Sequence, residues 1–239
     1  MRATAIVVAA GSGVRLGADT PKAFVRLGGL TLLAAALRTV SAVKSISEVI
    51  IAVPAGMETR ARRETEEVGV HVPVKIVPGG TERQDTVRLA LAVTATEAEL
   101  VIVHDAARPL ATVALFGACL ARAEVCGAAL VATPVTDTLK RVTQTEVSGG
   151  GPGQIMVAQT IPRAGLWQAQ TPQAFRRRLL VDAHAHALAA GITATDDSEL
   201  VERIGVRVAV VLGSPLNLKI TTRDDLRLAE AILVAQSRD

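Results

Sequence analysis

The first half of the chain alternates between uninterrupted apolar runs and segments whose apolar residues recur at helical spacing. ATAIVVAA at 3–10 has the unbroken apolar character of a buried strand. The segment at 30–40 carries apolar residues at helical spacing, at Leu33, Ala36, Leu37 and Val40. The same alternation predicts strands at 48–54, 72–78, 99–105 and 127–135 and helices at 57–68, 81–95 and 111–125. Buried strands separated by helices indicate parallel strands covered on both faces, so the pattern predicts a doubly wound α/β fold with a mostly parallel sheet.

The helix expected at 81–95 begins with a recognisable signal. Thr81 is followed three residues later by Gln84, which matches the capping-box pattern of a helix N-terminus. We therefore expect this helix to open at Thr81, with these two side chains capping its first turn.

The alternation stops after Val135. Residues 136–165 are rich in Thr, Gln and other β-type residues and contain a glycine-rich stretch at 149–153, which predicts an extended β-hairpin arm that leaves the main sheet. A long arm of this kind often packs on a second subunit, so we expect a homodimer with 136–165 as its dimerisation element. Beyond the arm we expect a helix at about 176–190, strands at 206–213 and 217–221, and a final helix at about 223–236. No internal repeat or low-complexity linker divides the chain, and we expect one domain over 1–239.

Composition narrows the functions that the fold can serve. Apolar residues make up 49% of the chain but aromatic residues only 2%, so the core is aliphatic and offers no aromatic platform for stacking nucleic-acid bases. The net charge of +3 is that of an ordinary soluble surface. No segment approaches the roughly 18 apolar residues of a membrane span. We therefore expect neither nucleic acid nor a membrane as a partner.

The two cysteines bear on the redox state of the protein and on metal binding. Cys119 and Cys126 are seven residues apart on an expected helix, where they share a face but are too distant to form a disulfide. We expect both to be buried, reduced thiols of a cytoplasmic protein. No group of Cys and His residues has the spacing of a zinc site.

AAGSGVRLGADTPKAF at 9–24 follows the first expected strand and contains a glycine-rich loop. A dinucleotide-binding fingerprint needs its third glycine where Leu16 stands, and a P-loop needs a lysine directly after Gly17, where this chain has alanine. What remains is the pattern G-x-G-x-R, followed by a Pro-Lys pair. Glycines let backbone amides approach phosphate oxygens, and Arg15 and Lys22 add positive charge over the same anion. The loop favours a nucleoside triphosphate site; a tight turn with two surface cations is the alternative.

Unusual polar residues follow the other expected strands as well. Gly79 and Gly80 precede a helix N-terminus, which is suited to hold an anion or a base edge. Further polar residues follow the later strands: Asp105, Arg108, Thr138, Lys140 and Lys219. Ligands of open α/β sheets bind beyond the C-terminal ends of the strands, so we expect these residues to share one site. A single aspartate among several cations suits a Mg²⁺–triphosphate complex.

Several motifs together resemble those of one enzyme family. They are AAGSGVRLG and PKAF in the first loop, then GGTERQDTV, VHDAARP, PVTDTLKR, QTPQAF, TDDSELVE and NLKITT. Over residues from about 4 to 235 they are similar to the motifs of the 2-C-methyl-D-erythritol 4-phosphate cytidylyltransferases, and HDAARP and QTPQ are much more specific than the loop. The resemblance implies a Rossmann-like nucleotidyltransferase fold. It also implies transfer of a cytidylyl group from CTP to 2-C-methyl-D-erythritol 4-phosphate, with release of pyrophosphate, in non-mevalonate isoprenoid biosynthesis.

The resemblance further implies a role for each matching residue, with Mg²⁺ as the cofactor. The implied catalytic residues are Arg15, Lys22, Arg163 and Lys219. The implied nucleotide-binding residues are Ala9, Ala10, Gly11, Gly13, Gly80, Arg83, Thr86, Asp105 and Ala106. The implied sugar-phosphate-binding residues are Asp105, Arg108, Thr138, Arg163 and Lys219, and Asp105 is also the implied metal ligand. In the family, the segments of Thr138 and Arg163 belong to an arm that completes the site of the partner subunit.

The chain departs from the family pattern at a few positions. Thr86 stands where many relatives have serine, and the hydroxyl is kept. Pro162 precedes Arg163 where an acidic residue is often found, and SGGGPG lengthens the arm relative to some relatives. The departures therefore concern mainly the arm and, with it, Arg163.

The chemistry of the implied reaction agrees with what the chain lacks. An attacking phosphate monoester is largely dianionic at neutral pH and needs no general base. No Ser-His-Asp or Cys-His constellation can be made out, and we expect His104 to orient the loop of Asp105 rather than to transfer protons. Two alternatives stay open: a cytidylyltransferase for ribitol 5-phosphate, and a non-catalytic nucleotide-binding regulator. The full set of cations argues against the regulator, because binding alone does not need every cation of a transition state.

Overall fold

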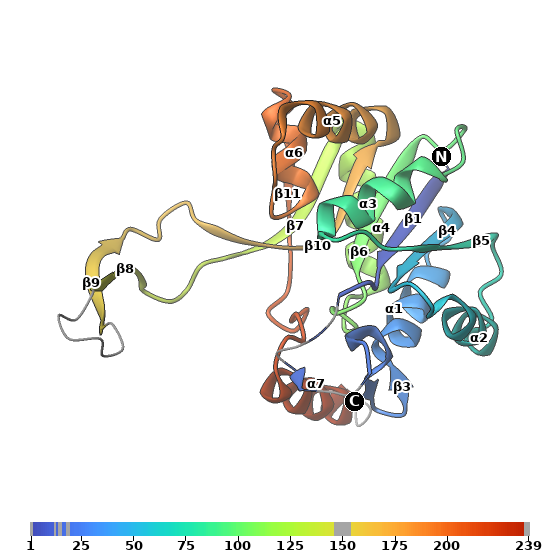
Figure 1. Ribbon diagram of the computed structural model, residues 1–239, viewed down its shortest axis with the longest axis horizontal. Coiled ribbons are helices and arrows are strands. Elements are labelled where there is room, and N and C mark those ends of the chain that lie inside the picture. The colour runs from blue at the N-terminus through green and yellow to red at the C-terminus, as the bar shows by residue number, and fades with distance from the viewer. Residues whose placement is uncertain (1, 12, 14–15, 18–19, 146–153, 237–239) are drawn as a thin grey trace.

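The computed structural model describes residues 2–11, 13, 16–17, 20–145 and 154–236 of the 239-residue chain. In these residues, seven strands form one sheet with the spatial order β11-β7-β10-β6-β1-β4-β5 (Figure 1). The strands are β1 (Ala3–Val8), β4 (Ile46–Val53), β5 (Val74–Pro78), β6 (Leu100–Asp105), β7 (Ala128–Pro134), β10 (Trp167–Arg176) and β11 (Ala209–Leu212). All run in one direction except β10, which lies antiparallel between β6 and β7. The mostly parallel sheet that the apolar runs predict is confirmed.

The two faces of the sheet bury separate aliphatic clusters. In β1, Ala5 and Val7 belong to a cluster with Leu37 and Phe116, whereas Ile6 between them belongs to a cluster on the other face. Successive side chains of a strand point to opposite faces, so a strand covered on both sides needs an unbroken apolar run. The first face is covered by α1 (Leu32–Ser41), α2 (Glu58–Val68) and α4 (Val113–Cys126), and the second by α3 (Arg83–Ala92), α5 (Arg177–Ala190) and α6 (Asp197–Arg203).

A third, smaller cluster joins the two ends of the chain. The helix α7 (Arg223–Gln236) packs against the short strand β2 (Arg26–Leu27), which follows the 3₁₀ turn η2 (Lys22–Phe24) and pairs with β3 (Leu30–Thr31). Leu16 of the glycine-rich loop and Ile220 lie together in this cluster. The packing therefore brings the loop after β1 close to the segment that carries Lys219.

Residues 136–145 and 154–165 leave the body of the molecule as a long arm (Figure 1). Near its end, β8 (Leu139–Thr145) and β9 (Gln154–Ile161) pair antiparallel in a two-stranded sheet of their own. Several large apolar side chains on these strands are exposed, namely Val142, Ile155, Met156 and Val157. The expected hairpin arm is confirmed, and its glycine-rich stretch at 149–153 lies outside the described residues.

The central strand β10 is not predicted by the apolar pattern. Its Gln and Thr residues continue the polar composition of the arm, so the pattern does not separate this strand from the arm. In the fold, Gln170 and Gln173 are buried, and their side-chain amides donate to Ser214 O at 2.9 Å and to Asp196 Oδ2 at 2.8 Å. Buried polar side chains are tolerated in a central strand when they are hydrogen-bonded in this way.

The predicted capping box at the start of α3 is wrong. The helix begins at Arg83, and its N-cap residue Glu82 makes no side-chain capping bond. The Gln84 amide instead donates to Ile192 O at 3.0 Å and accepts from Ala194 N at 2.8 Å. Gln84 therefore links α3 to the segment before α6, a tertiary contact that outweighs the local pattern.

Two further expectations about the C-terminal part need correction. Residues 217–221 form no strand, because Ile220 N donates to Ala107 O at 2.8 Å and the segment follows the loop after β6. The helix α6 is not anticipated at all by the pattern between 190 and 206. Both differences matter for function, because these two segments carry Lys219 and Asp197.

The cysteine expectation is half correct. Both thiols are free, and burial raises the pKa of Cys119 to about 12. Cys126 is exposed, because it is the last residue of α4, where the helix ends at Gly127. Among the described residues, no helix has the length and the hydrophobicity needed to span a bilayer.

Candidate active site

A cavity of about 450 Å³ opens at the C-terminal ends of β1 and β6, beside the start of α3. Eleven of the predicted site residues line it: Ala9, Ala10, Gly11, Gly13, Lys22, Gly80, Arg83, Thr86, Asp105, Ala106 and Lys219. Thr81, Glu82 and Thr221 also line it and were not predicted. The residues that follow separate strands thus meet in one place, as the rule for open α/β sheets requires.

The first loop forms one wall of this cavity. Gly13 has a φ of 70°, and a Cβ at this position would stand 2.6 Å from Lys22 Cβ. Both the left-handed backbone and the close approach of Lys22 therefore demand glycine here. Arg15 lies outside the described residues, and its role stays a prediction.

Two arginines from distant elements hold the backbone around this loop. Arg223, the first residue of α7, donates from Nε to Leu16 O at 3.2 Å and from Nη2 to Gly17 O at 2.9 Å. The guanidinium of Arg60 on α2 lies 4.6 Å from the ring centroid of Phe24, two residues after the loop lysine. The first loop is thus held in place by contacts with α7 and with α2.

The turn before α3 forms the opposite wall. Thr86 Oγ1 accepts from Gly80 N at 3.0 Å and donates to Glu82 O at 3.0 Å. A Cβ on Gly80 would collide with Cβ of Asp85, so only glycine fits the turn. The hydroxyl of residue 86 shapes this turn, which explains why threonine can stand in place of serine.

Asp105, the last residue of β6, is the anionic centre of the cavity. Its Oδ1 lies 3.0 Å from Arg83 Nε and its Oδ2 lies 2.7 Å from Lys219 Nζ, while its backbone N–H donates to Thr171 Oγ1 at 3.0 Å. Burial alone would raise the pKa of Asp105, but the charges of Arg83 and Lys219 outweigh burial and hold this pKa well below its usual range. The carboxylate is therefore ionised at any physiological pH.

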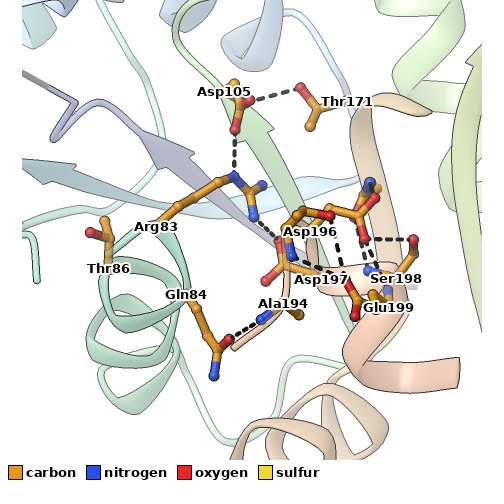
Figure 2. Close-up of polar contacts among 12 residues, drawn as sticks. Arg83, Gln84, Thr86, Asp105, Thr171, Ala194, Asp196, Asp197, Ser198 and Glu199 are labelled. Carbon is orange, nitrogen blue, oxygen red and sulfur yellow. Dashed lines mark hydrogen bonds and ion pairs between the residues drawn. The ribbon is translucent and has the colours of Figure 1, made fainter. Parts of the chain in front are cut away.

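Arg83 connects the cavity to α6 (Figure 2). Its Nη1 donates to Asp197 Oδ2 at 2.8 Å, and the other oxygen of Asp197 lies 3.2 Å from His184 Nε2. Burial would lower the pKa of Arg83, but Asp197 and Asp105 raise it above its usual value. Arg83 therefore carries a permanent positive charge at the cavity wall.

His104 has the structural role that its neighbourhood predicts. Its Nε2 lies 3.2 Å from Arg108 O and its Nδ1 lies 3.1 Å from Thr171 Oγ1. Complete burial lowers the pKa of His104 to about 4, so the ring is neutral at physiological pH. The ring ties the loop after β6 to β10 and does not line the cavity.

Three residues predicted for the sugar phosphate do not line the cavity. Arg108 donates from Nη1 to Asn217 O at 2.7 Å and from Nη2 to Ala169 O at 3.3 Å, so its guanidinium braces two backbone segments. Thr138 and Arg163 are exposed residues of the arm, and Arg163 donates to Thr136 O. Their predicted part in a site completed by a partner's arm stays a prediction.

The donor set offers little to a metal ion on its own. No group of three or more His, Cys, Asp or Glu side chains close enough to share an ion occurs in the part of the chain that the structure describes. Asp105 brings an ionised carboxylate to the cavity wall, and Glu82 also lines the cavity. This matches a Mg²⁺ ion that arrives with a triphosphate, because Mg²⁺ typically takes one or two carboxylates and completes its shell with phosphate and water.

Sequence reasoning misses the residues that support the site without lining the cavity. Thr171, Gln173 and Asp197 belong to motifs that carry the family resemblance, but no spacing rule assigns them a role. Asp197 contacts Arg83 across 114 positions of sequence, a distance at which local patterns carry no signal. In the sequence, the aspartate pair of TDDSELVE is the one hint that this segment has a role at the site.

Comparison with known proteins gives a consistent result. The model of the family "2-C-methyl-D-erythritol 4-phosphate cytidylyltransferase" matches residues 3–235. A protein of that name from Deinococcus radiodurans is 45% identical over 232 residues, which cover 97% of this chain and 89% of that protein. One from Acidobacterium capsulatum is 42% identical, with 99% of both chains covered.

Solved structures agree. The crystal structure of 4-diphosphocytidyl-2C-methyl-D-erythritol synthase from Anaerococcus prevotii superimposes with a TM-score of 0.80 at 32% identity, covering 97% of this chain and 98% of that one. The same fold therefore accompanies the same sequence motifs.

Proposed function

The chain belongs to the family of 2-C-methyl-D-erythritol 4-phosphate cytidylyltransferases, and from this premise we propose how its residues serve the reaction. The reaction joins CTP and 2-C-methyl-D-erythritol 4-phosphate into CDP-methylerythritol and releases pyrophosphate, in non-mevalonate isoprenoid biosynthesis. The observation that carries the proposal is the meeting of Lys22, Arg83 and Lys219 around Asp105 at one cavity.

The barrier to this reaction is electrostatic. The attacking phosphate is already a dianion, so no side chain has to remove a proton from it. Two polyanions must nevertheless approach each other in line, which requires positive charge and fixed geometry. Lys22 and Lys219 supply such charge, and the backbone of Ala10 and Gly11 offers amides to the phosphates, whereas the Ala9 N–H donates to Ala52 O at 2.8 Å. Arg15 belongs to the same set by resemblance.

Asp105 is the residue that would hold Mg²⁺. Its ionised carboxylate at the cavity wall fits a hard cation that also binds the triphosphate. When bound, Mg²⁺ would neutralise part of the phosphate charge.

The two cations on Asp105 are suited to different tasks. The side chain of Arg83 is 22% exposed and held by two carboxylates, whereas that of Lys219 is 44% exposed on a flexible stem. Arg83 therefore stays in the wall, where it meets the nucleotide. Lys219 turns to the incoming sugar phosphate, as a compact charge on a mobile chain can do.

The arm supports a dimer. It exposes apolar side chains on β8 and β9, far from the body of its own chain (Figure 1). Exposed apolar surface of this kind favours burial against another molecule. In a homodimer, Thr138 and Arg163 of one arm would contribute to the sugar-phosphate site of the partner, with Arg108 bracing the loop beneath it.

The two alternatives are less well supported. Ribitol 5-phosphate shares the phosphate and the polyol character of the substrate, but the matched family and the relatives named above carry the name of the methylerythritol phosphate enzyme. A non-catalytic regulator would not need Lys22 and Lys219 together at the cavity. The cytoplasm, where CTP is made and cysteines stay reduced, is the compartment we expect for the enzyme.

Pyrophosphate release from CTP tests the function. The purified chain is incubated with CTP and Mg²⁺, and with methylerythritol phosphate or ribitol 5-phosphate in parallel. We expect rapid release with the first acceptor, at least tenfold slower release with the second, and none after addition of EDTA. Faster release with ribitol 5-phosphate would reassign the substrate, release with neither would favour the regulator, and unchanged release in EDTA would remove the metal.

A further inference from the structure

The guanidinium of Arg83 contacts two buried carboxylates, Asp105 and Asp197, which lie on different sides of it. Nε lies 3.0 Å from Asp105 Oδ1, and Nη1 lies 2.8 Å from Asp197 Oδ2 (Figure 2). Asp105 lines the cavity, whereas Asp197 is 0% exposed and is not among the residues that line it. Arg83 therefore has one carboxylate on the ligand side and one on the protein side.

The arrangement forms a row of alternating charges. Asp197, Arg83, Asp105 and Lys219 follow one another, each within 3.0 Å of the next. An arginine with a single carboxylate partner commonly engages it with two parallel hydrogen bonds. Because Asp197 takes Nη1, the fork of Arg83 is divided between the two carboxylates instead of closing on Asp105.

Asp197 is itself firmly located. It follows the N-cap residue Asp196, whose Oδ1 accepts from Glu199 N at 2.9 Å, and Asp196 Oδ2 accepts from Gln173 Nε2 at 2.8 Å. The second oxygen of Asp197 lies 3.2 Å from His184 Nε2 on α5. Three elements, β10, α5 and α6, thus determine where this carboxylate lies.

We infer that Asp197 is a positioning residue for nucleotide binding: it holds the guanidinium of Arg83 from behind and keeps the fork from closing on Asp105. The inference rests on the proposed function, in which Arg83 meets CTP at the cavity wall. Removing the charge of Asp197 leaves Arg83 with Asp105 as its sole carboxylate, so the guanidinium turns away from the nucleotide and occupies the carboxylate that CTP·Mg²⁺ needs.

Asp197→Asn tests this inference with an isosteric change. We expect the dissociation constant of CTP, measured by calorimetry in Mg²⁺, to rise about tenfold, which is the loss of one charged hydrogen bond. The KM for CTP should rise by a similar factor, with kcat changed much less. An Asp197→Asn variant that binds CTP within twofold of the wild type overturns the inference.

The same substitution in an Arg83→Met background separates positioning from general damage. If Asp197 acts through Arg83, Asp197→Asn changes CTP binding less than twofold when Arg83 is already absent. An equal loss in both backgrounds means that Asp197 acts by another route, and the inference fails.

Asp224→Asn is the matched control. Asp224 also lies in the first turn of a helix and also pairs with an arginine, Arg227, but both side chains are largely exposed. We expect CTP binding and turnover to be unchanged in this variant.

Hydrogen exchange of Arg83, measured without nucleotide, tests the inference independently of the proposed function. In ¹⁵N-labelled wild-type protein, the Nη1–H₂ group of Arg83, assigned with Arg83→Lys, should exchange with water at least tenfold more slowly than that of an exposed arginine, because it donates to the buried Asp197. Fast exchange overturns the inference even if Asp197→Asn fails to fold. If the wild type does not bind CTP, the proposed function fails, and the Nη1 resonance and its change in Asp197→Asn still decide whether Asp197 holds Arg83.

Discussion

Single residues at this site act mainly through charge. Asp105 stays ionised because Arg83 and Lys219 outweigh the effect of its burial. His104 beside it is neutral, with a pKa of about 4, and forms hydrogen bonds that orient the loop. In the part of the chain that the structure describes, the cavity thus combines the Asp105 carboxylate with several cations, and the neutral His104 does not line it.

Lys22→Ala should lower kcat by a factor of about 100 or more, because the lysine neutralises charge that develops on the phosphates in the transition state. Steady-state pyrophosphate release measures the change. Lys44→Ala, which removes an exposed lysine, should leave turnover unchanged. Near-normal turnover in Lys22→Ala would take this lysine out of the mechanism.

The sequence predicts these residues unevenly, for a physical reason. Gly13 and Lys22 lie in the loop after the first expected strand, and Asp105 ends the fourth, so the topology of the sheet brings them together. Asp197 reaches the site only through tertiary packing of α6 on α5 and β10. The position of Arg108 is similar, because its hydrogen bonds to Ala169 and Asn217 depend on segments far along the chain.

At the scale of elements, β10 is the strand that connects the sheet to the residues of the site. It inserts antiparallel between β6 and β7, and its polar side chains reach both the loop of Asp105 and the start of α6. The apolar pattern predicts the parallel strands β1, β4, β6 and β7 correctly because both of their faces are buried. It misses β10 because that strand is recruited through hydrogen bonds of Gln and Thr side chains.

The arm invites a complementation experiment at this scale. Arg163→Ala damages the arm and Lys22→Ala damages the cavity, so a mixed dimer contains one site in which both residues are intact. We expect mixed and re-equilibrated variants to regain roughly a quarter of wild-type activity, since half of the dimers are mixed and half of their sites are whole. Each variant re-equilibrated alone serves as the control. No recovery in verified mixed dimers would show that Arg163 does not act in the partner's site.

At the scale of the whole molecule, distant parts of the chain converge on one edge of the sheet. The loop after β1, the turn before α3, the end of β6 and the segment before α7 all line the same cavity. The third cluster, with Leu16 and Ile220, fastens the two ends of the chain to each other beside it. The fold thus gathers Lys22, Arg83 and Lys219 at one cavity, where we propose that the two mutually repelling phosphates meet.

A crystal structure of the chain with CTP and Mg²⁺ tests this convergence most directly. We predict that the triphosphate lies in the 450 Å³ cavity between the backbone of residues 9–13 and Lys22, with the ion on Asp105 and Lys219 within reach of the α-phosphate. A nucleotide bound elsewhere, such as the groove between α1 and α7, or phosphates out of reach of both lysines, would contradict the account.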